Sequence, residues 1–566
     1  MALRRCPAFA DGSSFVSSIL LLLPLLPLLV AISSADCAPY PISAPIKDVV
    51  LSNNQKMRGV AMAVGTPPQN FAFLPQWPLN NTYVYDRQGQ CDSDWPENTC
   101  ITFRGGQYNE NASKTYAAAD STIAAMDSTP NITTQSLWAR DSFTLNSNLT
   151  LEDFPLGIPR TDWKSSYTPQ MAFGLGHNST ILSVLKAAGK VSSRTWSFFW
   201  GLTGPTQNVQ MDGSFVFGGY DRAKVKGKNY TRPLSTLKPT CTTGMLVTIV
   251  DIRLNFPNGS SPSLFTGPQS AAMSACIEPD FPVLMTMPYD PYYEYFSTLI
   301  GGTYIGRSFG VNFYGMLYAP QNVYDGDLTI VFDTGLSVRI PNSVLVNPDL
   351  VIDKETGIPY TNNSALEILI NSAQDVNAND LPILGRQFLS SAYVMLNQDS
   401  GQFTLWEANP TTNEDLVAVD VNNRVMEKFC TPSSSNTTET PSNITSTQPT
   451  TASSSSHSAS AHGISRGAIA GIVVGSIAGI AGTAGLIYYY CIRSRRNAAA
   501  RVPNTPGPPS YSPILPLELN NKSYQSYSEP QEMFAPGPPH RPGSSRPRSR
   551  RAVPETYELD GSERWM

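Results

Sequence analysis

Asp333 stands in the clearest catalytic setting of this sequence. It begins the turn Asp333-Thr334-Gly335, which directly follows the apolar stretch Leu328–Phe332. A carboxylate held in a tight turn after a buried strand can take up or release a proton, and two such carboxylates that lie close together share one proton. The sequence therefore poses the question of which second residue would face Asp333.

Several stretches occur in an order that defines the organisation of the chain. They are Gly65–Phe71 (GTPPQNF), Phe173–His177 (FGLGH), Gly213–Gly227 (GSFVFGGYDRAKVKG), Ile330–Ser337 (IVFDTGLS) and Pro382–Asn409, which begins PILGRQF. Together they resemble the landmarks of the pepsin-like aspartic peptidases and cover nearly all of residues 38 to 430. The resemblance implies an all-β, bilobal fold in which each lobe supplies one catalytic carboxylate. Asp333 would be the second of these, with Thr334 and Gly335 beside the substrate.

Gln76 occupies the place of the first catalytic carboxylate. In the family this residue stands seven positions after the glutamine that corresponds to Gln69, and Tyr83 keeps the same register on the far side. Trp77 and Pro78 replace the small residues of the family's turn. Glutamine is neutral and can neither act as a base nor share a proton. The resemblance therefore predicts a catalytically impaired or inactive site.

Other acidic residues offer a weak alternative to the missing carboxylate. Asp86 is the nearest, ten positions after Gln76, and Asp92 and Asp94 fall between two cysteines. The stretch Ser121–Phe143, which should correspond to the family's flap, lacks the family's Tyr-Gly-x-Gly pattern. An active acid endopeptidase at the cell surface remains the competing hypothesis if another acid enters the site.

The two ends of the chain predict secretion and membrane attachment. Arg4, Arg5 and the apolar run Phe15–Ile32 indicate a signal peptide over residues 1 to 35, cleaved after Ala35, with an uncleaved anchor as the alternative. Residues 467 to 492 are uncharged and long enough to cross a bilayer, and arginines follow at once. We therefore expect a single-pass type I protein of the plasma membrane.

The cysteines and glycosylation sequons agree with an extracellular domain. Six cysteines lie between the two apolar segments, and their spacing favours the pairs Cys91–Cys100, Cys241–Cys276 and Cys37–Cys430, although fifteen pairings are possible. The predicted N-glycosylation sites are Asn80, Asn111, Asn131, Asn148, Asn178, Asn229, Asn258, Asn362, Asn436 and Asn443. No cysteine or histidine spacing indicates a metal, and no cofactor is expected.

Composition divides the rest of the chain. Short β-branched and aromatic runs predict a large β domain. The resemblance divides it into an N-terminal lobe over residues 36 to 228 and a C-terminal lobe over 229 to 430. Helical signals are few, and the candidates are Ser179–Lys190 and Ala365–Gln374. A Ser/Thr-rich stalk over 431 to 463 and a disordered Pro/Arg-rich tail over 493 to 566 should flank the membrane segment. The whole chain has a net charge of −5, with +1 in residues 1 to 35 and +4 in 493 to 566, so residues 36 to 492 carry about −10. This charge argues against nucleic acid or an anionic surface as a partner of the ectodomain.

Three functional hypotheses follow. The leading one is a surface-anchored, catalytically impaired relative of the aspartic peptidases, similar in architecture to fungal surface members, that binds an extracellular peptide, protein or glycan in its cleft. The second is an active acid endopeptidase. The third is a surface sensor or adhesion protein whose proline-rich tail could bind SH3 or WW modules. In the predicted membrane segment, Gly471, Gly475 and Gly479 could bring the helices of two chains together as a dimer.

Overall fold

A computed structural model describes residues 37 to 430, apart from residues 78, 88–90, 92–94, 128–129, 161–168, 237–240, 267–271 and 375–376. The predicted signal peptide, stalk, membrane segment (467–492) and tail lie outside the described residues. Within the described part of the chain, no helix is long and apolar enough to cross a membrane.

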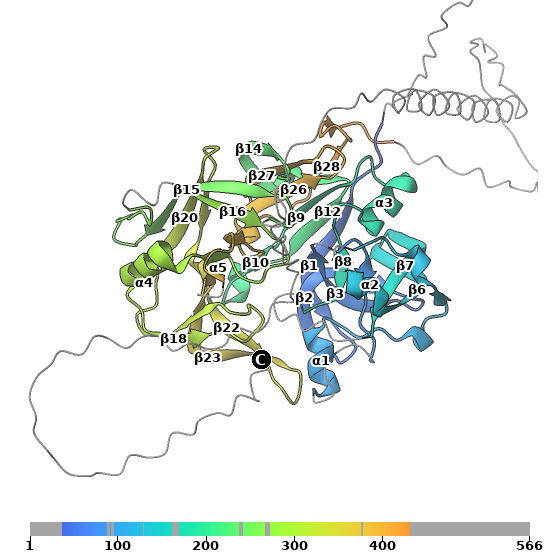
Figure 1. The fold of residues 1–566 in the computed structure, drawn as a ribbon, viewed down its shortest axis with the longest axis horizontal. Helices are drawn as coiled ribbons and strands as arrows, with labels where there is room; N and C mark the ends of the chain where they lie inside the picture. Colours follow the sequence, from blue (N-terminus) through green and yellow to red (C-terminus); the bar gives the residue numbers. More distant parts are fainter. Residues whose placement is uncertain are drawn as a thin grey trace, which may run out of the picture. The chain divides into compact units, whose positions relative to one another are not determined.

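A thirteen-stranded sheet forms the larger part of the fold (Figure 1). Its order is β14 (Val225–Pro233), β27 (Gln402–Ala408), β26 (Ala392–Asn397), β9 (Thr195–Phe199), β12 (Gly213–Phe217), β1 (Ile42–Val50), β2 (Lys56–Val64), β3 (Gln69–Gln76), β8 (Ala172–Gly174), β4 (Thr82–Tyr83), β7 (Leu149–Pro159), β6 (Ser136–Asn146) and β5 (Ala117–Ala119). The expected lobe boundary at residues 228 and 229 therefore falls inside β14. We call this sheet and its attachments the N-terminal lobe.

Two further sheets form the C-terminal lobe, between β14 and β26 in the sequence. The seven-stranded one runs β21 (Ser337–Ile340), β20 (Asp327–Phe332), β15 (Leu246–Asn255), β16 (Met273–Ile277), β25 (Ile383–Leu384), β17 (Met285–Met287) and β24 (Ile370–Ser372). The four-stranded one runs β18 (Tyr304–Arg307), β19 (Met316–Tyr318), β23 (Pro359–Ile368) and β22 (Val346–Ile352). The predicted all-β architecture is thus compatible with the structure.

The remaining elements are short. Two small sheets join β13 (Gly219–Asp221), β28 (Leu416–Val419) and β29 (Val425–Met426), and β10 (Leu202–Thr203) with β11 (Gln210–Met211). The α-helices are α1 (Glu97–Phe103), α2 (Pro130–Thr134), α3 (Thr180–Ala187), α4 (Glu294–Ile300) and α5 (Asn342–Leu345), accompanied by brief 3₁₀ and π turns.

One predicted helix is confirmed and the other is wrong. The Ser179 hydroxyl accepts a hydrogen bond from the Leu182 amide and begins α3, as its cap position predicts. By contrast, Ala365–Gln374 covers the end of β23 and all of β24. Most of this stretch is buried without interruption, as in a strand covered on both faces, and a short apolar run does not distinguish such a strand from a helix.

The three predicted disulfides are confirmed. The Cα atoms are 4.8 Å apart in Cys37–Cys430, 6.0 Å in Cys91–Cys100 and 5.4 Å in Cys241–Cys276. The first bond joins the two ends of the described chain, where the Ala38 amide also donates to the Lys428 carbonyl at 2.8 Å. It therefore closes a loop that contains both lobes.

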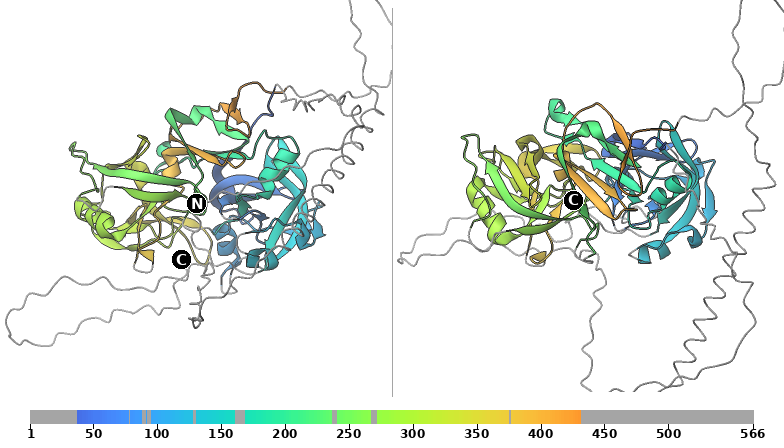
Figure 2. Two further views of the ribbon diagram at one scale, coloured as in Figure 1. Left: turned by 45° about the horizontal axis from the view of Figure 1, so that its top comes forward. Right: turned by 90° about the horizontal axis from the view of Figure 1, so that it is seen from above.

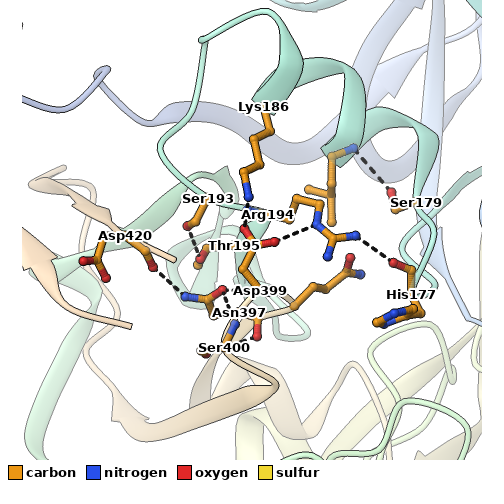
Figure 3. A network of polar contacts seen from close by, with 12 residues as sticks. His177, Ser179, Lys186, Ser193, Arg194, Thr195, Asn397, Asp399, Ser400 and Asp420 are labelled. Carbon is orange, nitrogen blue, oxygen red and sulfur yellow. Dashed lines mark hydrogen bonds and ion pairs between the residues drawn. The ribbon is translucent and has the colours of Figure 1, made fainter. Parts of the chain in front are cut away.

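Asp399 joins the turn of the β26–β27 hairpin to α3 and to the residue before β9. Two further views show this hairpin, in orange, between the strands of the two lobes (Figure 2). At its turn, the Asp399 carboxylate accepts from Lys186 Nζ at 2.8 Å and from Arg194 Nε at 2.9 Å (Figure 3). Burial alone would raise the pKa of Asp399, but the bonds from Lys186 and Arg194 lower it below its ordinary value.

Replacement of Asp399 should destabilise this attachment. Because its folded pKa is lowered, Asp399 contributes stability that is present above the unfolded pKa and is lost as the pH falls through the folded pKa. Asp399→Asn should reduce the free energy of unfolding by about 1–3 kcal/mol at neutral pH. Thermal unfolding of the unmodified full-length chain and of the variant measures this loss. Asp415→Asn, which breaks the exposed Arg222–Asp415 pair, is the control. An equal loss in both variants would contradict the assignment.

Candidate functional site

Gln76 lies buried at the end of β3, where β3 runs parallel to β8 and places Gln76 opposite Gly174. Its side-chain amide donates to the Gln170 carbonyl at 3.2 Å, and its backbone carbonyl accepts from the Leu175 amide at 3.2 Å. A Cβ at Gly174 would approach the Leu79 carbonyl to 2.5 Å, so this close backbone approach requires glycine. The first-lobe residue is thus a neutral amide bonded to the backbone.

The C-terminal lobe repeats this arrangement at Glu278. Strand β16 runs parallel to β25, with Ile277 opposite Leu384, and the Glu278 amide donates to the Leu384 carbonyl at 2.9 Å. The next strand, β17, pairs antiparallel with β25, just as β4 pairs antiparallel with β8. Continuing the register places Glu278 beside Gly385, as Gln76 lies beside Gly174. Glu278 is therefore the topological counterpart of Gln76.

The expectation that Asp333 is the second catalytic carboxylate is consequently wrong. Asp333 lies in the turn between β20 and β21, and β15 separates β20 from β16 in the sheet. Its carboxylate pairs with Arg232 at 2.9 Å. Thr334 and Gly335, which the resemblance placed beside the substrate, shape this hairpin turn. Gly335 adopts a φ of +85°, a conformation that favours glycine.

Asp280 joins the loop after β16 to the loop after β3. The backbone amide of Trp77 acts on the buried Asp280 carboxyl and works against the rise of its pKa, and the Arg386 guanidinium donates to the Asp280 backbone carbonyl at 3.1 Å. Burial and the neighbouring Glu278 raise the pKa of Asp280 to about 8. Asp280 is therefore largely uncharged at neutral pH and serves as a polar contact between the two loops.

The Glu278 side chain also has a hydrogen-bond partner. Its carboxylate accepts from the Thr242 hydroxyl at 2.9 Å, and burial raises its pKa. On the other side of the junction, the Trp77 ring packs against Trp196 with ring centroids 5.3 Å apart. Both carboxyls at the junction thus come from one loop of the C-terminal lobe, whereas the N-terminal lobe contributes an amide and an indole.

The lobes touch directly close to Gln170. Met57, Ala72 and Ile101 of the N-terminal lobe form one buried apolar cluster with Ile352 of the C-terminal lobe. The space enclosed between Gln170 and Arg386 is only about 20 Å³, room for about one water molecule. Among the described residues, the lobes are therefore closely packed at this contact.

Hydrogen bonds between α1 and the β22–β23 hairpin add to this contact. The Thr99 hydroxyl donates to the Lys354 carbonyl at 2.5 Å, and the Thr102 hydroxyl donates to the Gly357 carbonyl at 2.8 Å. A Cβ at Gly357 would lie 2.4 Å from the Asn98 carbonyl. Backbone from the two lobes thus meets closely at the hairpin.

The stretch expected to correspond to the flap is bound to the loop that follows Gln76. The buried Asp127 carboxylate accepts hydrogen bonds from the Asn80 backbone amide at 2.5 Å, from Asn81 Nδ2 at 2.8 Å and from the Tyr83 hydroxyl. The Asn81 side chain also exchanges two hydrogen bonds with Ala125. These bonds hold the segment on its own lobe. No sequence motif marked Asp127 for this role.

The alternative acids do not complete the site. Asp86 forms an ion pair with Arg160, and Asp92 and Asp94 lie outside the described residues. Within the described ranges, no three His, Cys, Asp or Glu side chains come together as a potential metal site.

The structure separates the predicted glycosylation sites by exposure. Asn80 is buried and bonded to Met126, so its expected use as a surface site is wrong. Asn362 is half-buried, the side chain of Asn131 is not described, and Asn436 and Asn443 lie outside the described residues. The exposed sequon asparagines are Asn111, Asn148, Asn178, Asn229 and Asn258.

Comparison with known proteins supports a distant relationship. No family model matches the chain. A stretch of 207 residues, 37% of this chain, is 26% identical to candidapepsin of Candida tropicalis. The chain spans 42% of the length of that relative. This similarity supports an ectodomain related to the pepsin-like aspartic peptidases.

The raised pKa of Asp280 predicts a pH dependence of stability. The folded protein keeps a proton on Asp280 that the unfolded chain loses above its ordinary pKa of 3.8. The free energy of unfolding should therefore fall as the pH rises from about 4 to about 8, by at most about 1.4 kcal/mol per pH unit. In Asp280→Asn this fall should be smaller, while the exposed Asp325→Asn control keeps it. Denaturant titrations at several pH values in this range measure the free energy of unfolding. An equal dependence of this free energy on pH in all three proteins would refute the assignment.

Burial of Asn80 predicts an unmodified sequon. Glycopeptide mass spectrometry of the secreted chain should find Asn80 without a glycan, because attachment there would break its contact with Met126. Asn178, which is exposed and begins a sequon nearby, provides the matched comparison. A fully occupied Asn80 would disprove the structure of this loop.

Proposed function

We propose that this chain is a catalytically inactive relative of the aspartic peptidases, whose ectodomain functions by binding an extracellular ligand. The observation that supports this most strongly is the pair of topologically equivalent positions. They hold Gln76, bonded to a backbone carbonyl, and Glu278, bonded to Thr242. Aspartic peptidase chemistry requires one carboxylate from each side to share a proton around a water molecule, and Gln76 cannot take part.

The contacts around the junction support the same proposal. Arg386 binds the Asp280 backbone carbonyl, Asp127 holds the flap-like segment on its own lobe, and the lobes pack together beside Gln170. A working peptidase must admit a peptide between its lobes. A ligand therefore more readily occupies a surface other than the expected site beside Gln76.

Location at the cell surface is part of the proposal. It depends on the apolar segments 15–32 and 467–492, the intervening sequons and the stalk. The three disulfides of the described domain are consistent with an oxidising compartment. In this arrangement the stalk would hold the folded domain away from a plasma membrane, with the tail in the cytoplasm.

The competing function is acid proteolysis, with Glu278 as the carboxyl at the position equivalent to Gln76. To separate the two, the full-length chain is incubated with a diverse peptide mixture from pH 3 to 7, beside Glu278→Gln. We expect no cleavage by either protein while thermal unfolding shows both to be folded. Cleavage by the unmodified chain that Glu278→Gln abolishes would refute the proposal.

A further inference from the structure

A pocket of about 360 Å³ opens between the two lobes' sheets, away from the Gln76 junction. One wall comes from β14 and β27 of the large sheet, and the other comes from the start of β15 and the turn between β20 and β21. In Figure 1 these strands lie together at the top of the fold. Its volume is within the range of small-molecule sites.

The floor of this pocket is apolar. Phe403 and Leu405 of β27 form part of the lining, together with Leu336 from the β20–β21 turn. These three side chains are buried within the protein, yet they border the opening. Leu234, Leu246 and Val247, which also line the pocket, are half-buried, so a ligand that covers them removes apolar surface from water. The pocket is therefore suited to the apolar body of a small molecule.

The wall of the pocket carries one ion pair. Arg232 of β14 donates from Nη2 to the Asp333 carboxylate at 2.9 Å, and the side chains are 45% and 38% exposed. A guanidinium has five N–H donors in a planar fork and can hold two carboxylates at once. Arg232 can thus bind an incoming carboxylate while it remains beside Asp333.

We propose that this pocket binds a small amphipathic carboxylate. Its aryl or alkyl body would lie on Leu234, Leu246 and Val247, and its carboxylate would bond to Arg232. A carboxylate fits better than an amine, because the guanidinium fork can offer it paired hydrogen bonds in a fixed geometry, whereas an amine would depend on Asp333, whose charge Arg232 already neutralises. This inference rests on the proposed binding function and names a ligand class for it.

The test is a ligand-observed fluorine NMR titration of the full-length chain in lipid nanodiscs. The probes are 4-(4-fluorophenyl)butyrate and its alcohol and amine analogues, which share one apolar body. We expect only the carboxylate to bind measurably. Arg232→Met should weaken its binding about tenfold or more, and Arg232→Lys should weaken it less, because the charge remains and the fork is lost.

Asp333→Asn provides a test of opposite sign. Removing the neighbouring negative charge should strengthen carboxylate binding severalfold. Arg222→Met, which breaks an exposed ion pair outside the pocket, is the matched control and should leave binding unchanged. Thermal unfolding confirms that each variant is folded.

Three outcomes would overturn the inference. If the amine bound preferentially and Asp333→Asn abolished this binding, the pocket would be a cation site. Equal binding to the unmodified chain and to Arg232→Met would show partition into lipid or an unrelated surface. No binding of any probe would remove this ligand class. None of these results depends on whether the chain cleaves peptides, so failure here is distinguishable from failure of the proposed function.

Discussion

The structure depends on the junction of the loops that follow β3 and β16, where the Trp77 backbone amide acts on the buried Asp280 carboxyl. A carboxyl out of contact with water is costly unless it is neutral or hydrogen-bonded. Here the proton it retains below a pKa of about 8 and the backbone amide of the opposite lobe meet this requirement together. The junction is thereby fixed in one arrangement.

The other polar groups at the junction follow from this arrangement. Gln76 is bonded to Gln170, and Glu278 is bonded to Thr242. Groups that would activate a water molecule in a peptidase instead satisfy one another or the backbone. The apolar cluster around Met57 and Ile352 adds direct packing between the lobes. The fold is thus compatible with an aspartic peptidase ancestry, while its centre has the character of a structural contact.

The position of Gln76 and the three disulfides could be predicted from the sequence, because they depend on neighbouring residues or on the number of cysteines. Gln76 could be placed because recognisable residues flank it on both sides, and an even number of cysteines left few sensible pairings. Asp333 could not be placed correctly, because an Asp-Thr-Gly turn after an apolar strand also suits an ordinary hairpin. Only the parallel pairing of β16 with β25 identifies Glu278. The burial of Asn80 by Asp127 likewise depends on contacts between residues 47 positions apart.

The most direct test of the central claim is calorimetric titration of the full-length chain with a hydroxyl-bearing transition-state analogue of peptide hydrolysis at mildly acidic pH. Such analogues bind aspartic peptidases by placing the hydroxyl between the two carboxylates. With Gln76 and Glu278 at the paired positions and both held by other partners, no binding heat should be observed. Stoichiometric binding that disappears in Glu278→Gln would show that a working catalytic centre is present and would contradict this account.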